Sequence, residues 1–300
     1  MTENSRRKFI KNASLTFGCT ILPSYLTAAK NSKNSKKQAN SPLPPSERVN
    51  IGCIGVGGRA KSVIPSLAKD GAHIVALCDV DFKWGSKTIA ANPQAQTFHD
   101  FRVMLDKVGK DIDAVSVVTP DHTHFTAAIA SMALGKHVYV EKPLTHTFEE
   151  SEILMRAEKK FGVVTQMGNQ GHTSTGYHQF GHLVNKGIIS NIVKMEAWKT
   201  PSLWFMKADK RFKGAPPTAA IPDNLKTYDL WCGPRKVLPY SNLYHPFDWR
   251  GFHEYGMGML GDWGAHLLDF VHDKLELGLP TNINATRMDD HNHHLFPLFT

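Results

Sequence analysis

A glycine-rich segment near the start of the globular sequence could hold phosphate groups. Gly55, Gly57 and Ala60 stand in the order G-x-G-x-x-A, directly after a short apolar run. The first glycine permits a tight turn, the second lets a ligand approach the backbone, and the small third residue lets the following helix pack closely. The start of that helix offers free N–H groups to an anion. Such a turn on its own is a weak signal, because glycine-rich turns are common.

Asp79 strengthens the signal. It lies 24 residues after Gly55, at the end of the next apolar run. A carboxylate there can accept hydrogen bonds from both hydroxyls of an adenosine ribose, and it would repel a 2′-phosphate. The turn and Asp79 together predict a dinucleotide site that takes NAD rather than NADP. The alternative is an ordinary sheet turn without a ligand.

Three further residues could take part in acid–base chemistry. Asp262 and His266 are four residues apart, which puts both on one face of a helix. Lys142 stands at the carboxyl end of an apolar run, and such strand ends are where α/β sheets bind ligands. The alternatives are a helix cap for Asp262, a buried structural role for His266 and a solvated surface position for Lys142.

The apolar pattern predicts the elements that must position these residues. Continuous apolar runs, which do not alternate, indicate strands that are covered on both faces. Helical stretches separate the runs, so we predict a parallel, doubly wound α/β sheet of the Rossmann type over residues 48–168. The predicted strands are 49–54, 73–79, 114–120, 137–143 and 163–168, and the predicted helices between them include 59–69 and 125–134.

Residues 169–300 have a different texture and predict a second, α+β domain. Residues 192–199 alternate as an antiparallel strand with one buried face would, a helix is expected near 261–275, and another strand near 283–287. This region is also dense in tryptophan. Its aromatic rings could form a wall against the apolar faces of a sugar, and core packing is the alternative for at least half of them. They are Trp204, Trp231, Trp249 and Trp263.

Four short segments in combination resemble the Gfo/Idh/MocA oxidoreductases. They are TPDHTH at 119–124, EKP at 141–143, MGNQGH at 167–172 and GDWGAH at 261–266. The likeness runs from about residue 48 to the end of the chain. It implies an NAD-binding domain, followed by an α+β domain with an open, mostly antiparallel sheet.

The resemblance also implies an activity and its catalytic residues. Family members mostly oxidise or reduce a hydroxyl or keto group of a sugar, glycoside or cyclitol by hydride transfer. The catalytic residues implied here are Lys142, Asp262 and His266. Some relatives are instead NAD-dependent glycosidases that work by transient oxidation and elimination, so that activity stays an alternative. A sugar-binding protein with a dead site is a third.

The chemistry suggests a role for each of the three. Oxidation of a carbinol removes a hydride from carbon and a proton from oxygen, and a base with a pKa near neutrality takes the proton best. His266 suits that role, Lys142 would stabilise the developing alkoxide, and Asp262 would position hydroxyls or favour the protonated imidazole.

Further candidates surround these residues in the quoted segments. His122 and His124 could contact the cofactor or, equally, cap a helix. Asn169, Gln170 and His172 could line the cleft or, equally, make hydrogen bonds within a turn. No metal site is predicted. The cofactor-binding candidates are Gly55, Gly57, Gly58, Arg59, Asp79, Thr119, Pro120, His122, His124, Glu141 and Asn169, and the substrate-binding candidates are Lys142, Gln170, His172, Trp249 and Arg250.

The N-terminus predicts export. SRRKFIK at residues 5–11 precedes an uncharged stretch that ends in small residues near position 29, a pattern typical of a twin-arginine signal peptide. Residues 30–47 are rich in Lys, Asn, Ser and Pro and read as a flexible linker. We expect a periplasmic or otherwise exported protein that the twin-arginine machinery carries folded, with its NAD. Lipid attachment at Cys19 is not expected, because the preceding residues match poorly.

Charge and length set two further expectations. The net charge is +8, but residues 1–48 hold nine Lys and Arg against two acids, which leaves +1 for the remaining 252 residues. No base-reading module accompanies the charge, so nucleic acid is not an expected partner. The family's open sheet usually needs well over 100 residues after the helix at 261–275. We therefore expect an incomplete second domain, and a homo-oligomer through the open sheet is only an option.

Overall fold

The computed structural model describes residues 44, 47–199 and 215–284. The chain divides into two units, Met1–Ser46 and Glu47–Thr300, and the second contains the elements described below. The predicted signal peptide, most of the predicted linker, Trp204 and residues 285–287 of the second predicted strand lie outside the described residues.

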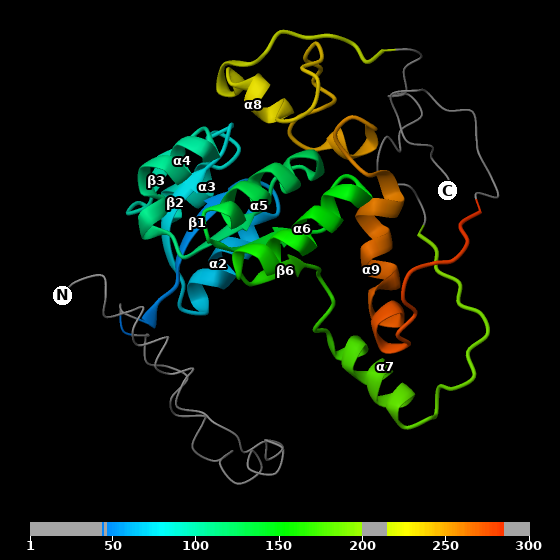
Figure 1. Cartoon of the computed structure of the whole chain (residues 1–300). Helices are drawn as coiled ribbons and strands as arrows, with labels where there is room; N and C mark the ends of the chain where they lie inside the picture. The colour runs from blue at the N-terminus through cyan, green and yellow to red at the C-terminus, as the bar shows by residue number, and fades with distance from the viewer. Residues whose placement is uncertain (1–43, 45–46, 200–214, 285–300) are drawn as a thin grey trace. The chain divides into compact units, whose positions relative to one another are not determined.

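Residues 50–168 contain a parallel sheet of six strands (Figure 1). Its order is β3-β2-β1-β4-β5-β6, and all five neighbouring pairs are parallel. The winding reverses between β1 and β4, which is where sheets of this type bind ligands. The predicted doubly wound sheet is confirmed. The strands are β1 (Asn50–Ile54), β2 (His73–Cys78), β3 (Gln96–Phe98), β4 (Ala114–Val117), β5 (His137–Glu141) and β6 (Thr165–Gly168).

Helices cover both faces of the sheet, which explains why its strands are continuously apolar. One buried cluster joins β1 and β2 to α2 through residues such as Leu77 and Ile64. Another joins the sheet to the helices of the opposite face through residues such as Val117 and Met104. The helices are α2 (Ala60–Lys69) and α3 (Ser86–Ala91) on the first face, and α4 (Phe101–Val108), α5 (His124–Ala133) and α6 (Phe148–Phe161) on the second.

The start of α6 determines the path of the chain after β5. Thr147 accepts a hydrogen bond from the Glu150 amide, and Glu150 accepts one from the Thr147 amide in return, which is a capping box. Glu150 also accepts from the His146 amide at 2.9 Å. The segment between β5 and α6, which includes Lys142, is therefore anchored at its far end.

The remaining described residues form an aromatic core and three α-helices. Trp231 and Trp249 are only 3% and 4% exposed and pack with four tyrosines and a phenylalanine, so core packing accounts for most of their surface. None of the described helices has both the length and the apolarity that a membrane span requires. The helices of this part are α7 (Thr175–Asn185), α8 (Tyr228–Cys232) and α9 (Gly258–Lys274).

The predicted antiparallel strand at 192–199 is wrong. Residues 190–199 have no regular secondary structure, and Val193 and Trp198 are 98% and 76% exposed. An alternating pattern becomes a stable strand only where neighbouring strands and a packed face support it, and within the described ranges none pairs with this segment. Ile283 and Asn284 also lie outside any strand. The open sheet, and an oligomer built on it, stay predictions.

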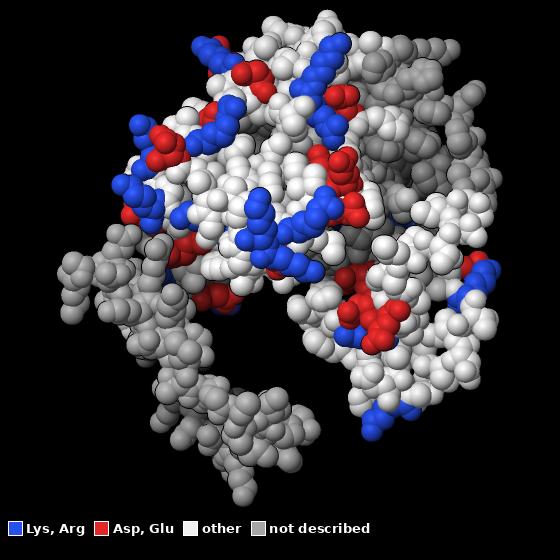
Figure 2. Space-filling view, in the orientation of Figure 1, with Lys and Arg blue, Asp and Glu red and all other residues white. Residues whose placement is uncertain are grey.

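Charges of both signs share the surface in Figure 2. Acidic and basic side chains are interspersed over the described part of the face shown there. A nucleic-acid site is typically marked by a continuous basic stripe, and the described part of this face carries none.

Candidate active site

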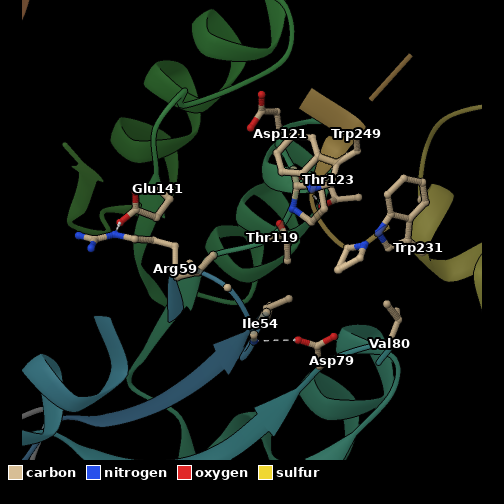
Figure 3. A pocket seen from close by; sticks show the side chains of 18 of the residues that line it. Ile54, Arg59, Asp79, Val80, Thr119, Asp121, Thr123, Glu141, Trp231 and Trp249 are labelled. Atoms are coloured by element: carbon tan, nitrogen blue, oxygen red, sulfur yellow. Dashed lines mark hydrogen bonds and ion pairs between the residues drawn. The ribbon is translucent and has the colours of Figure 1, made fainter. Parts of the chain in front are cut away.

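A large cavity lies at the carboxyl ends of the strands (Figure 3). Its volume is about 1460 Å³, whereas sites for one small ligand measure roughly 300–1,000 Å³. It therefore has room for a dinucleotide and a second small molecule. The predicted site residues that line it are Gly55, Gly57, Gly58, Arg59, Asp79, Thr119, Pro120, Glu141, Lys142, Gln170, Trp249, Arg250, Asp262 and His266.

The glycine-rich turn borders this cavity and has no space for side chains. Gly55 has φ +81°, and a Cβ atom there would lie 2.4 Å from the Val118 carbonyl oxygen. A Cβ atom on Gly57 would lie 2.0 Å from Cδ1 of the Trp84 indole. The glycines thus let β4 and the Trp84 ring pack closely against the turn, and the start of α2 beside it offers the free N–H groups that favour an anion. These residues fit the pyrophosphate of a dinucleotide.

Asp79 holds the turn in shape. Its Oδ2 accepts hydrogen bonds from the Val56 amide at 2.8 Å and the Gly57 amide at 3.2 Å, and its Oδ1 accepts from the Asp81 amide at 2.9 Å. Burial raises the pKa of Asp79, while these hydrogen bonds oppose the rise. A carboxylate has about four acceptor positions, so one is left for a ribose hydroxyl. The sequence did not indicate this second, structural role.

Glu141 connects β5 to the same turn. Its Oε1 lies 3.3 Å from Nε of Arg59 and accepts a hydrogen bond from the Tyr139 hydroxyl at 2.9 Å. Glu141 is buried, whereas Arg59 is partly exposed beside the first turn of α2. The carboxylate therefore orients the Arg59 guanidinium at the end of the helix where phosphate would bind.

Lys142 and Asp262 meet although they are far apart in sequence. The Lys142 ammonium donates to the backbone carbonyl of Asp262 at 2.8 Å and also forms an ion pair with its carboxylate. The two side chains are only 11% and 12% exposed. The pair joins the end of β5 to α9 within the cavity lining.

His266 follows one turn later on α9. Its Nδ1 lies 3.1 Å from the carbonyl oxygen of Gln170. Because a carbonyl oxygen only accepts, Nδ1 carries the proton and Nε2 keeps a lone pair. Burial and the nearby Lys142 ammonium lower the pKa of His266. The imidazole is therefore neutral near pH 7 and able to act as a base.

Several cavity residues were not among those predicted from the sequence, and Asp121 and Trp84 are two of them. Asp121 follows β4 in the TPDHTH segment, lines the cavity and is only 5% exposed. Burial, with the neighbouring Asp262 charge, raises its pKa to about 7 against the opposing effect of Arg250 and Lys142. A carboxyl group in the short segment that follows a parallel strand was the available signal. Trp84, five residues after Asp79, had no comparable signal.

His122 and His124 differ from the predicted cofactor contacts. In His122 the two ring nitrogens face the carbonyl oxygens of Tyr255 and Trp231, and in His124 they face those of Pro143 and Thr119, all within 3.1 Å. Both rings are fully buried, and burial lowers the pKa of each, to about 3 for His122. Neither belongs to the cavity lining, because the turn after β4 directs them into the protein.

Asn169 and His172 also have positions other than those predicted. The Asn169 amide donates to the Ala265 carbonyl at 3.0 Å, and His172 Nδ1 lies 3.0 Å from the Asp269 carboxylate. Neither residue lines the cavity. Both attach the segment after β6 to α9, so their observed contacts position this helix.

The sheet, the glycine-rich turn and the cavity define a dinucleotide-binding α/β protein. Residues 49–169 match the oxidoreductase family with an NAD-binding Rossmann fold, and residues 174–293 match that family's C-terminal α/β domain. The chain belongs to the Gfo/Idh/MocA oxidoreductase family.

Individual relatives cover only part of the chain. This chain is 35% identical over 161 residues to a glycosyl hydrolase family 109 protein of Solibacter usitatus. That match covers 50% of this chain and 35% of that protein. The chain is 25% identical to inositol 2-dehydrogenase of Salmonella paratyphi B, over 46% of this chain and 42% of that enzyme. The matches thus span less than half of these relatives.

A solved structure shows the same fold. The crystal structure of an NAD-binding protein from Listeria innocua aligns with a TM-score of 0.51 and 21% identity, over 75% of this chain and 54% of that chain.

Replacement of Gly55 by alanine tests the turn. Its positive φ and the close Val118 carbonyl predict a loss of about 1–3 kcal/mol in the free energy of unfolding, together with weaker binding of NAD. Gly109→Ala is the matched control, because Gly109 has φ −56° and nothing within 4 Å of the added carbon. Denaturant unfolding measures the change in stability of each variant, and cofactor titration measures its affinity for NAD. Equal effects of the two variants would contradict the assigned role of Gly55.

Proposed function

We propose that the protein is an exported NAD-dependent oxidoreductase that oxidises or reduces a hydroxyl or keto group of a sugar, glycoside or cyclitol. The observation that carries the proposal is the Lys142–Asp262 pair, with His266 one helical turn further. These three groups line the same cavity as the glycine-rich turn. A cation, a carboxylate and a neutral imidazole are the groups that such chemistry requires.

The protein's own residues account for the movement of the proton. Bound NAD would supply the hydride acceptor. His266 takes the proton of the substrate hydroxyl at Nε2, while its Nδ1–H bond to the Gln170 carbonyl holds the ring in place. The Lys142 ammonium stabilises the negative charge that develops on the substrate oxygen, and Asp262 fixes the ammonium in position.

Asp79 supports NAD over NADP. Its carboxylate lines the cavity beside the glycine-rich turn and keeps one acceptor position for a ribose hydroxyl. A 2′-phosphate at the same place would add negative charge next to a buried acid, which is unfavourable. We expect the affinity for NAD to exceed that for NADP.

A second candidate is a glycosidase that uses its cofactor without net oxidation. The name of the Solibacter usitatus relative supports it. His266 as a base and Lys142 as a cation would also serve the first step of that reaction, because that step too begins at a hydroxyl group. The two candidates differ in the product released.

One experiment separates these functions. The purified full chain is tested for bound NAD by absorbance and mass. It is then incubated with a panel of sugars, glycosides and cyclitols while cofactor reduction and sugar release are followed separately. Reduction without release supports the oxidoreductase, and release without net reduction supports the glycosidase. If protein that holds NAD shows neither cofactor reduction nor sugar release, both functions are excluded.

Lys142→Ala should strongly reduce turnover and leave the cofactor site intact. Removal of a positioned cation costs about 100- to 1,000-fold in kcat where it stabilises developing charge. The affinity for NAD should stay the same, because the variant leaves the glycine-rich turn unchanged. Lys69→Ala, on the exposed end of α2, is the control and should retain full activity. Unchanged turnover of Lys142→Ala would remove this residue from the mechanism.

The pH dependence of oxidation should report His266. Its neutral form is the base, and burial and the Lys142 ammonium lower its pKa below 6.5, against the opposing effect of Asp262 and Glu141. The contribution of His266 to kcat/KM should therefore be constant near neutral pH and fall only as the pH drops below 6.5. The acid limb should disappear in His266→Gln. A limb near pH 7 that persists in this variant would assign the titration to Asp121.

The export proposal rests on Arg6 and Arg7 in SRRKFIK. Translocation in the folded state would let the protein carry its cofactor out of the cytoplasm. Cell fractionation should find the full chain outside the cytoplasm, and an Arg6→Lys/Arg7→Lys variant should be retained inside. An equal distribution of the two proteins would refute twin-arginine export.

A further inference from the structure

Asp121 has a carboxylate oxygen that the protein leaves without a partner. Its Oδ2 is fully buried and makes no hydrogen bond to any described residue. The carboxyl group also accepts a hydrogen bond from the Met257 amide. A buried polar atom without a partner costs roughly 1–3 kcal/mol, and in native proteins such an atom calls for an explanation such as a ligand.

The surroundings of Asp121 are those of the reaction centre. The charges that act on it are those of Arg250, Lys142 and Asp262, and all of these residues line the cavity. In Figure 3 Asp121 lies near Trp249, far from Asp79 at the other side of the view. Asp121 therefore lies on the substrate side of the cavity and not on the adenosine side.

Asp121 is also held in place. It begins a short 3-10 helix (Asp121–Thr123), and the next residue, His122, contacts the carbonyls of Tyr255 and Trp231 through both ring nitrogens. The Arg250 guanidinium stacks on the Trp249 ring, 4.2 Å from its centroid. Groups held in this way are preorganised for a ligand.

We propose that Asp121 and Arg250 together bind the hydroxyl group next to the reacting carbon of the substrate. That hydroxyl donates its hydrogen bond to Oδ2 of Asp121 and accepts one from the Arg250 guanidinium. The inference rests on the proposed function and adds the two residues that determine specificity for the hydroxyl next to the reacting carbon. A substrate without the neighbouring hydroxyl leaves the buried oxygen unsatisfied, and sites of this kind discriminate strongly against such analogues.

The test compares paired probes on full-length Asp121→Asn and wild-type protein, saturated with NADH for the binding measurements and with NAD⁺ for the turnover measurements. The probes are D-glucose with its 2-, 3- and 4-deoxy analogues, and trans-cyclohexane-1,2-diol with cyclohexanol. Saturation-transfer NMR measures binding without turnover, and KM and kcat are measured for every probe that is oxidised. Asp106→Asn on the exposed side of α4 is the matched control.

The wild-type protein should bind the diol of a pair at least tenfold more tightly than its deoxy partner. In Asp121→Asn this ratio should fall to about two or less, through a higher KM for the diol, whereas Asp106→Asn keeps the wild-type ratio. The melting temperature of Asp121→Asn should not fall by more than about 2 °C, because the asparagine oxygen still accepts from the Met257 amide.

Several results would overturn the inference. One is an unchanged ratio in Asp121→Asn, and another is failure of the wild-type protein to bind any diol. A large loss of stability would make Asp121 a structural residue, and weaker NADH binding with an unchanged ratio would assign it to the cofactor. None of these results decides whether NAD and turnover are present, so the proposed function is judged separately by bound cofactor and the substrate panel.

Discussion

The ion pair between Lys142 and Asp262 is the contact on which the candidate site depends. Both side chains are largely withdrawn from water, and the loss of one member of a buried pair costs about 3–5 kcal/mol. The end of β5 is therefore obliged to meet α9, 120 residues further along the chain. Once they meet, His266 is brought to the cavity on the same helix, and its ring is positioned by the Gln170 carbonyl.

Hydrogen bonds to the backbone keep this arrangement rigid. The neutral His124 ring lies between the carbonyl oxygens of Thr119 and Pro143 and donates its one N–H to one of them, so it packs between the segments that follow β4 and β5. Asn169 and His172 attach the segment after β6 to α9. Polar residues that do not touch the cavity thus hold those that do, and such preorganisation gives charges in a site most of their effect.

The cavity has two ends with different chemistry. At one end, glycine backbone, Asp79 and the start of α2 suit a dinucleotide. At the other, Asp121, Arg250 and the Lys142–Asp262 pair present charges of both signs, which suits a neutral ligand rich in hydroxyl groups. The oxidoreductase and the glycosidase both require this pairing of a redox cofactor with a polyol, so the nature of the product and not the architecture distinguishes them.

The sequence by itself determined the sheet, the glycine-rich turn and the position of Lys142, because continuous apolar runs and glycine spacing are local signals of buried strands and tight turns. Asp262 and His266 could be placed on one helical face for the same reason. Only the tertiary structure decided that His122 and His124 turn toward backbone carbonyls, that residues 192–199 form no strand, and that Asp121 keeps a buried oxygen free. Each of these depends on contacts with segments distant in the chain, which local spacing does not encode.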